Sequence, residues 1–272
     1  MTDYRTRFAP SPTGELHLGH AYSAWVAWQA ASCDPSRFLL RIDDLDFTRC
    51  QDQFRHSQID DLHWLGLSWD AAPLHQSARM DRYQQALRFL QDEGLIYPCY
   101  LTRREVDAIL SAPQETSLKG ALSDTEQSDR AGSGTKAAWR LDMAQIKHRS
   151  FPTSWQDLTY GEQRLSLDAI GDVVIARRDI GASYHLSVVL DDYDSQITLV
   201  TRGADLIAET PVQILLHHLL NLPVPHYAHH ALVRDEAGKR LAKRDDARAL
   251  KTYRNQGQSP EYVVNLSQSL IK

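Results

Sequence analysis

The sequence predicts an α/β fold in which helices cover a parallel sheet. Three runs near the N-terminus indicate this: "YRTRFAP" favours a short strand, "AYSAWVAWQAA" a buried helix and "RFLLRID" a second strand. A loop rich in Gly and Pro separates the first strand from the helix. Such alternation is typical of parallel sheets, because parallel neighbours need a crossover connection that is usually helical.

Further helices are expected from apolar spacing and end signals. Apolar residues from Phe54 to Leu65 recur at roughly helical spacing before Gly66, and a similar pattern from Met80 to Leu90 precedes Gly94, which suits a C-terminal cap. The run "TRRE" is a capping box that opens a short helix after residue 102.

The second half of the chain favours strands, with helices near its end. Residues 112–136 are poor in large apolar side chains and predict a flexible loop. The runs "AAWRLDM", "QRLSLD", "GDVVIARR", "YHLSVVLDD" and "QITLVTRG" then favour strands. Thr210 and Pro211 suit the start of a helix through "VQILLHHLLN", and the tail after residue 244 can form one or two more.

Composition restricts the function classes. The net charge of −5 and the pI near 6.2 argue against a strongly basic, non-specific nucleic-acid binder, so any RNA contact must be local. No apolar run approaches the roughly eighteen residues of a membrane span, and the N-terminus lacks a secretory signal. Cys33, Cys50 and Cys99 are widely spaced, which fits a reducing compartment. We therefore expect a cytoplasmic protein with no membrane partner.

The stretch "TGELHLGH" has the composition of a phosphate-binding loop. A triphosphate needs backbone N–H groups at close range, a helix N-terminus and side-chain donors. Gly14 and Gly19 lack a Cβ that would hold a ligand away, Pro10 stiffens the approach, and His17 and His20 can project to one side of the helix start. Alone, the stretch also fits a tight turn with two surface histidines.

Taken with the rest of the chain, this stretch carries a family resemblance. In order, "FAPSPTGELHLGH", "RIDDLD", "HQSAR", "VVLDD", "TRGADL", "YAHHAL" and "GKRLAKRD" resemble the glutamyl branch of the class I aminoacyl-tRNA synthetases. The resemblance implies a Rossmann-type class I synthetase catalytic domain with an inserted α+β subdomain. It implies a first half over 1–96, an insertion over 97–170 and a second half with the "RLAKR" loop and a short helical tail over 171–272.

The short tail further implies a truncated member without an anticodon-binding domain. Such members activate L-glutamate with ATP to glutamyl-adenylate without needing tRNA. They transfer glutamate to the queuosine base in the anticodon of tRNA(Asp) instead of the tRNA 3′ end, and a monomer is expected. Mg²⁺ is implied by the ATP chemistry, with no dedicated carboxylate cage in the sequence.

The resemblance assigns roles residue by residue. The catalytic residues are expected to be His17, His20 and Lys243. Glutamate is expected to contact Arg7, Ser11, Asp43, Tyr184 and Arg202. ATP is expected to contact Pro10, Gly14, Gly19, His17, His20, Arg240, Leu241 and Lys243. Two positions depart from the usual pattern: Asp43 stands where many relatives have Glu, and Ala242 where Ser is common.

A further departure concerns zinc. Many relatives bind Zn²⁺ in the insertion through a C-x-C pair, a Tyr and a third Cys. Here Cys99 is kept, Leu101 replaces the second Cys, and no cysteine follows. Because one thiolate cannot build a tetrahedral structural site, we predict that zinc is absent and that the chain has no metal ligands.

Three other functions are compatible with parts of the sequence. A nucleotidylyltransferase could share "HLGH", but Arg7, Tyr184 and Arg202 argue for glutamate. A truncated glutamyl-tRNA synthetase could still charge the tRNA 3′ end. A catalytically silent paralogue that acts as an RNA-binding or regulatory module would show no ATP turnover with glutamate. The intact His17, His20 and Lys243 argue against it.

Overall fold

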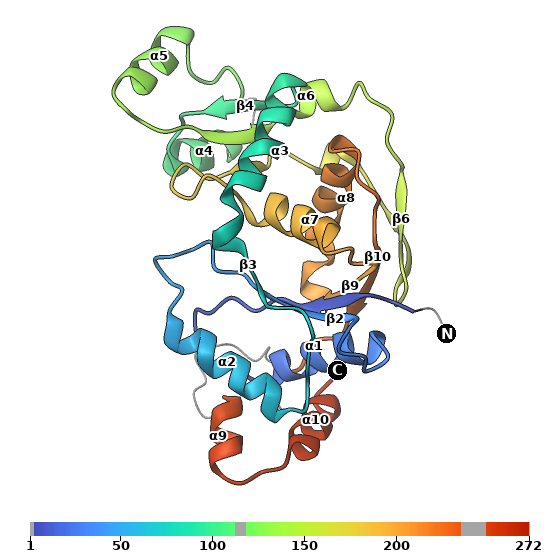
Figure 1. The fold of residues 1–272 in the computed structure, drawn as a ribbon. Coiled ribbons are helices and arrows are strands. Elements are labelled where there is room, and N and C mark those ends of the chain that lie inside the picture. Colours follow the sequence, from blue (N-terminus) through green and yellow to red (C-terminus); the bar gives the residue numbers. More distant parts are fainter. Residues whose placement is uncertain (1–2, 112–117, 235–248, 272) are drawn as a thin grey trace.

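The computed structural model describes residues 3–111, 118–234 and 249–271. Two sheets built mainly of parallel strands form its centre (Figure 1). The first has the order β1-β2-β3, from β1 (Thr6–Phe8), β2 (Phe38–Ile42) and β3 (Leu74–His75). In the second, β9 (Leu199–Gly203), β10 (His226–His230) and β6 (Ser154–Asp157) are parallel, and β7 (Gly161–Arg164) pairs antiparallel with β6.

The two sheets meet between β1 and β9. The carbonyl oxygen of Arg5 accepts hydrogen bonds from the backbone N–H groups of Thr198 (3.0 Å) and Leu199 (3.2 Å). The parallel α/β fold predicted from the alternating pattern is therefore confirmed.

Helices cover both faces of this central layer (Figure 1). On one face α1 (Leu18–Ala30) packs against β1 and β9, and α10 (Pro260–Ser269) packs on α1; α2 (Asp52–Trp64) and α9 (Leu250–Asn255) flank them. On the other, α3 (Met80–Asp92) contacts α7 (Tyr184–Asp194), which contacts α8 (Thr210–Leu219). Each face has its own apolar core. Short 3-10 helices complete the connections: η1 (Gln76–Arg79), η2 (Leu167–Ala169) and η3 (Ala204–Glu209).

A smaller antiparallel sheet lies at one end of the molecule, at the top of Figure 1. It has the order β4-β5-β8, from β4 (Ile96–Cys99), β5 (Ala138–Leu141) and β8 (Val174–Ala176), and carries α4 (Arg103–Leu110), α5 (Asp124–Gly132) and α6 (Met143–Ile146). The predicted segment limits cut across both sheets. The hairpin β6–β7 falls within 97–170 yet joins the large sheet, whereas β8 falls after residue 170 and joins the small one.

The flexible loop predicted over 112–136 is wrong in its second half. Residues 124–132 form α5, whose N-cap Ser123 accepts a hydrogen bond from the backbone of Glu126 while the Glu126 side chain accepts one from the backbone of Ser123. The loop prediction rested on the lack of large apolar residues and did not use this capping box. None of the residues of α5 is buried, so local capping stabilises it more than packing does.

The strand predicted for "YHLSVVLDD" is also wrong, because this run forms α7. Seven consecutive residues from Leu186 to Asp192 are buried, since the helix lies between the sheet, α3 and α8. A short run that is buried on every side shows no periodicity that separates helix from strand. Two smaller differences occur: "QRLSLD" runs from β7 into η2, and Glu209, not Thr210, is the N-cap of α8. No helix among the described residues has the length and apolar character needed to cross a membrane.

Candidate active site

A cavity of about 650 Å³ opens at the carboxyl ends of β1, β2, β9 and β10. Ligands of open α/β sheets bind at this edge. Nine of the predicted site residues line it: Arg7, Pro10, Ser11, His17, Gly19, His20, Asp43, Tyr184 and Arg202. Gly14 does not line it, and its carbonyl oxygen accepts a hydrogen bond from Gln58 (2.7 Å). Arg240, Leu241 and Lys243 lie outside the described residues.

The two histidines stand together at the N-terminus of α1. Their rings stack with centroids 3.8 Å apart. His17 is the N-cap, its Nδ1 accepting from the backbone of Gly19 (3.1 Å), and Nδ1 of His20 accepts from the backbone of His17 (3.2 Å). Because both Nδ1 atoms are acceptors, a neutral ring carries its proton on Nε2. Each ring can therefore present an N–H donor beside a helix N-terminus, which suits an anion.

Gly19 has a packing role that the sequence did not reveal. A Cβ at this position would lie 3.0 Å from Cε1 and 3.2 Å from Nδ1 of the His17 ring. That is closer than nine in ten real Cβ contacts, so the His17 ring would have to shift by a few tenths of an ångström to accommodate a larger residue. The glycine thus makes room for the His17 ring, and it also lines the cavity.

The chain on both sides of residues 235–248 is held at this cavity. Val233 lines it, and Arg234 donates its backbone N–H to Leu270 (3.0 Å). After the gap, Ala249 forms a bridge with His17, and the backbone N–H of Leu250 donates to Leu16 (2.8 Å). Of the described residues on either side of 235–248, Val233 therefore lies in the cavity wall and Ala249 beside His17.

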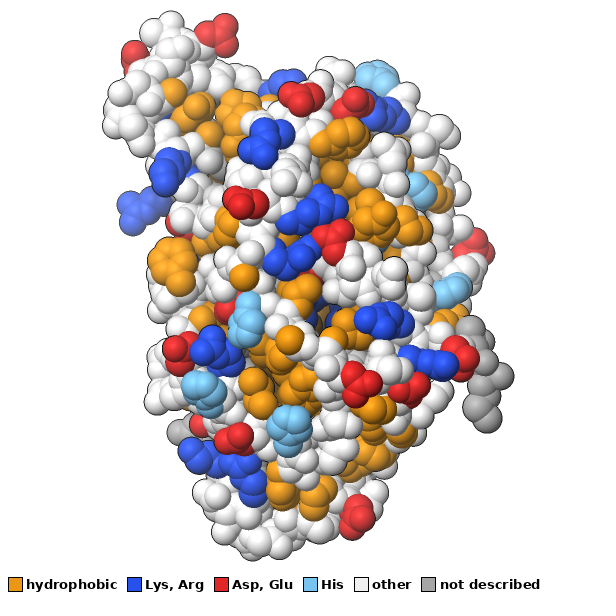
Figure 2. Space-filling view, in the orientation of Figure 1, with side chains coloured by type: hydrophobic (Ala, Val, Ile, Leu, Met, Phe, Trp, Pro, Cys, Tyr) orange, Lys and Arg blue, Asp and Glu red, His pale blue; other side chains and the backbone are white. Residues whose placement is uncertain are grey.

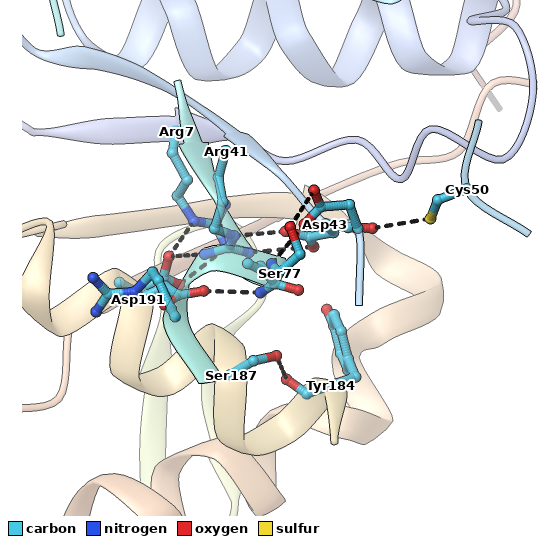
Figure 3. A network of polar contacts seen from close by, with 12 residues as sticks. Arg7, Arg41, Asp43, Cys50, Ser77, Tyr184, Ser187 and Asp191 are labelled. Atoms are coloured by element: carbon cyan, nitrogen blue, oxygen red, sulfur yellow. Dashed lines mark hydrogen bonds and ion pairs between the residues drawn. The ribbon is translucent and has the colours of Figure 1, made fainter. Parts of the chain in front are cut away.

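Alternation along two strands brings Arg7 and Arg41 to one face. On β1, Phe8 faces the core beside α1 while Arg7 points to the opposite face, and Arg7 is in register with Leu39 of β2, two residues before Arg41. Both guanidinium groups reach Asp192 of α7: Arg7 Nε lies 2.8 Å and Arg41 Nη1 2.6 Å from Oδ1, and Arg7 Nη2 lies 3.2 Å from Oδ2. Figure 3 shows the two arginines side by side above α7.

Asp43 completes this buried charge cluster. Its Oδ1 accepts from Nε of Arg41 (2.7 Å). Burial raises the pKa of Asp43, and Arg41 only partly opposes the rise. Burial also opposes ionisation of Asp192, but Arg7 and Arg41 outweigh it and lower the pKa of Asp192. With Asp192 ionised, Arg7 already has a carboxylate partner.

Arg202 has a different environment. Its guanidinium donates to His229 Nε2 (3.0 Å), Gln213 Oε1 (2.8 Å) and Thr210 Oγ1 (2.5 Å), and its Cζ lies 5.5 Å from the centroid of the Tyr227 ring. None of these groups is a carboxylate, and within the described part of the chain Arg202 forms no ion pair. Three of its five N–H donors are used, so one N–H on each Nη atom remains for a ligand. A buried charge without a counter-ion is costly, so the site favours an anionic ligand here.

Tyr184 and Ser11 complete the predicted set. Tyr184 begins α7 directly after the N-cap Ser183, and its side chain rises from the first turn of the helix (Figure 3). It remains 42% exposed in the cavity wall, so its hydroxyl is accessible to a ligand. Ser11 lies in the loop after β1, where its carbonyl oxygen accepts from Gln58 (3.1 Å).

Sequence reasoning missed four residues of this site: Arg41, Asp157, Asp192 and His229. Arg41 stands in "RIDD", Asp192 in "VVLDD" and His229 in "YAHHAL". Asp157 stands within the range predicted as the insertion. For Arg41 and Asp192 the available signal was a charged residue in or beside an apolar run, because such a residue needs a partner elsewhere in the chain. Asp157 and His229 carried no such signal. Which partner it finds depends on strand register and helix packing.

The fold and this cavity define the class of the protein. The chain matches the family of "tRNA synthetases class I (E and Q), catalytic domain" over residues 3–270 and belongs to it. It is therefore an enzyme of the ligase type, whose class joins an amino acid to tRNA at the expense of ATP.

Named relatives narrow the comparison. A glutamyl-Q tRNA(Asp) synthetase from Rhodobacter capsulatus is 46% identical over 96% of this chain and 98% of that relative. A glutamate-tRNA ligase 2 from Syntrophus aciditrophicus is 34% identical over 97% of the chain, which spans only 56% of that relative. The crystal structure of a glutamate tRNA ligase from Elizabethkingia meningosepticum has a TM-score of 0.80 at 24% identity, covering 97% of this chain and 60% of that one, and supports the fold.

Cys99 lies in an apolar environment. It is buried in a small cluster with Tyr97, Leu101 and Val106, and also with Leu118 and Leu122. Over the described ranges, no three His, Cys, Asp or Glu side chains gather in a way that could hold a metal ion.

The absence of zinc remains a prediction from the sequence. Purified protein dialysed against buffer without a chelator should contain no stoichiometric zinc, because a single thiolate is a weak ligand. Elemental analysis that finds one equivalent of zinc per chain would contradict this prediction.

Proposed function

We propose that the protein activates L-glutamate with ATP and transfers it to the queuosine base in the anticodon of tRNA(Asp). The observation that carries the proposal is the uncompensated charge of Arg202 in the same cavity as the stacked pair His17 and His20. A relative with the corresponding printed name matches this chain over 98% of its own length.

The arginines give the site a preference for a dicarboxylate. Arg202 would hold one carboxylate of glutamate through its two remaining N–H donors. Arg7, which also uses three of its donors, retains N–H groups for the second contact, while its charge is balanced by Asp192. Asp43, beside Arg41, is the acidic group that would receive the ammonium, and Tyr184 and Ser11 would contribute hydroxyl groups.

The histidines would serve the activation step. A glutamate carboxylate oxygen attacks the α-phosphorus of ATP in line, the bond to the bridging oxygen breaks, and pyrophosphate leaves with glutamyl-adenylate as the product. The Nε2–H groups of His17 and His20 and the N-terminus of α1 would stabilise the growing charge on the phosphate oxygens. Mg²⁺ would accompany the nucleotide phosphates.

Lys243 would neutralise the leaving pyrophosphate. Replacing it with Ala should lower glutamyl-adenylate formation at least about a hundredfold, while glutamate binding changes by less than about twofold, because the charge acts mainly in the transition state. Single-turnover adenylate formation and calorimetric glutamate titration measure the two effects. Lys251→Ala is the control, since Lys251 is exposed and lies 4.0 Å from Glu15. Equal losses in both measurements would contradict this role.

The acceptor is tested by locating labelled glutamate on RNA. The protein, ATP, Mg²⁺ and labelled glutamate are incubated with tRNA(Asp) that contains or lacks queuosine, and the label is mapped by nuclease digestion. Label in the anticodon loop of the queuosine-containing RNA alone supports the proposal. Label on neither RNA would contradict transfer while leaving activation to be judged by pyrophosphate exchange.

Label at the 3′ end would instead support a second candidate, charging of tRNA as in the glutamate-tRNA ligases. This candidate is favoured by their 34–38% identity to almost the whole chain. The chain covers only 56–57% of those relatives. The higher identity of 46% to a glutamyl-Q tRNA(Asp) synthetase is the reason for placing this function second.

The face in Figure 2 shows Lys and Arg side chains interspersed with Asp and Glu, so it offers no large basic area for extended RNA contact.

A further inference from the structure

Behind Arg202 lies a second buried layer that neither the family match nor the relatives' names assign. Nδ1 of His229 lies 2.5 Å from Oδ2 of Asp157, and both side chains are completely buried. His229 is in register with Arg202 across β10 and β9, and Asp157 ends β6 on the other side of β10. The sheet thus aligns an acid, an imidazole and a guanidinium from three neighbouring strands.

The donors and acceptors fix the state of the imidazole. Arg202 Nε can only donate, so Nε2 of His229 is an acceptor and the ring proton lies on Nδ1, directed at Asp157. Burial lowers the pKa of His229 although Asp157 opposes the shift. Burial opposes ionisation of Asp157, but His229 and the backbone of Tyr160 and Thr159 outweigh it and lower its pKa.

Asp157 is itself fully engaged. Its Oδ1 accepts from the backbone N–H groups of Thr159 (2.8 Å) and Tyr160 (2.9 Å), in the turn between β6 and β7. Its Oδ2 accepts from the backbone N–H of His229 (3.2 Å) as well as from Nδ1. All four contacting groups are N–H donors to the Asp157 carboxylate. The anion is therefore satisfied in place, and an imidazole ring separates it from the guanidinium.

Resting on the proposed function, we propose that Asp157 and His229 are positioning residues for the glutamate site. They hold Arg202 by its Nε, so that its two remaining N–H groups have a fixed direction. They do so through a neutral ring, which leaves the charge of Arg202 for a substrate carboxylate. Arg7 shows the contrasting arrangement, because Asp192 contacts it directly and balances its charge.

Two substitutions of His229 separate the two contacts of the ring. In His229→Asn the amide N–H₂ can replace Nδ1 as the donor to Asp157, but nothing replaces Nε2 as the acceptor from Arg202. In His229→Gln the longer side chain can place its oxygen near Nε2 and restore that acceptor. We expect the Asn variant to raise the KM for glutamate about 10- to 100-fold with kcat nearly unchanged, and the Gln variant to recover most of this loss.

Asp157→Asn is a second, independent variant. One of its two acceptor oxygens becomes an N–H₂ group, which must face either the turn backbone or His229. If it faces His229, it can move the ring proton to Nε2, where it opposes Arg202 Nε–H. We expect the KM for glutamate to rise here too, while the KM for ATP stays unchanged.

The measurement is glutamate-dependent ATP-pyrophosphate exchange, with glutamate binding by calorimetry and urea unfolding of each variant. His226→Asn is the matched control, because His226 lies on the same strand but is exposed and contacts Tyr4 at its ring edge. A wild-type KM for glutamate in folded His229→Asn or Asp157→Asn would overturn the inference. So would an equal rise in this KM in the Gln and Asn variants of His229, or the same rise in the control. If His229→Asn does not fold, Asp157→Asn and His229→Gln decide it.

Failure of the proposed function has a different signature. If the wild-type protein binds glutamate but modifies no RNA, the proposed acceptor is refuted. The positioning inference is then still tested by the KM values of the variants for glutamate. Wild-type protein that binds no glutamate refutes both.

Discussion

Replacing Arg202 with Gln is expected to reduce glutamate-dependent pyrophosphate exchange by more than about a hundredfold, mainly through the KM for glutamate. The shorter, neutral amide removes the one guanidinium in the cavity wall whose partners in the described structure are all neutral. It also leaves the acceptors of His229, Gln213 and Thr210 without their donors, which adds the cost of unpaired buried groups. Initial rates over a range of glutamate concentrations check this result.

Two further variants define what the loss means. Arg202→Lys keeps the charge but loses the planar fork, so it should retain an intermediate KM. Arg82→Gln removes a partly exposed arginine that pairs with Asp194 on the surface, and it should leave the kinetics unchanged. A wild-type KM in Arg202→Gln would show that no substrate carboxylate is held at this position.

Replacing Asp192 with Asn is expected to lower the free energy of unfolding at neutral pH by about 3–5 kcal/mol, because it leaves Arg7 and Arg41 without their shared buried counter-ion. The Asp192 side chain is 6% exposed, and those of Arg7 and Arg41 are 9% and 4% exposed, so water can replace the lost partner only in part. Urea unfolding gives the difference. Asp194→Asn, on the same helix but more exposed, should cost no more than about 1 kcal/mol.

The effect should depend on pH with a definite sign. The pKa of Asp192 is lower in the folded protein than in the unfolded chain, so its ionisation stabilises the fold above the ordinary aspartate range and this contribution is lost as pH falls through the folded pKa. The difference between wild type and Asp192→Asn should therefore be largest near neutrality and shrink in strong acid. A difference that grows on acidification would contradict the assignment of Asp192 as the ionised partner.

Short-range signals account for the elements that were predicted correctly. The helix that begins near Gly19, the helix from Met80 with Gly94 after its end, and the helix opened by Thr102 all have their caps within a few residues. Such signals depend on neighbouring backbone groups and can be identified without the rest of the fold.

The errors have the opposite cause. The run at Tyr184–Asp192 has an apolar pattern that fits either helix or strand, and it is helical because it lies between two other helices and the sheet. It was also not possible to predict from the sequence that the hairpin β6–β7 belongs to the large sheet and not to the insertion. The pairing of β6 with β10 joins residues that are far apart in the chain.

For the candidate site, the family resemblance that the chain's motifs carry was enough to propose glutamate and ATP and to name nine residues that share one cavity. Those motifs concentrate chemically distinctive side chains in short segments. The charge balance was settled by folding: α7 presents Asp192 to two arginines, whereas the register of β9 and β10 gives Arg202 a neutral histidine. Charge balance depends on which distant residues become neighbours, and linear spacing does not specify those neighbours.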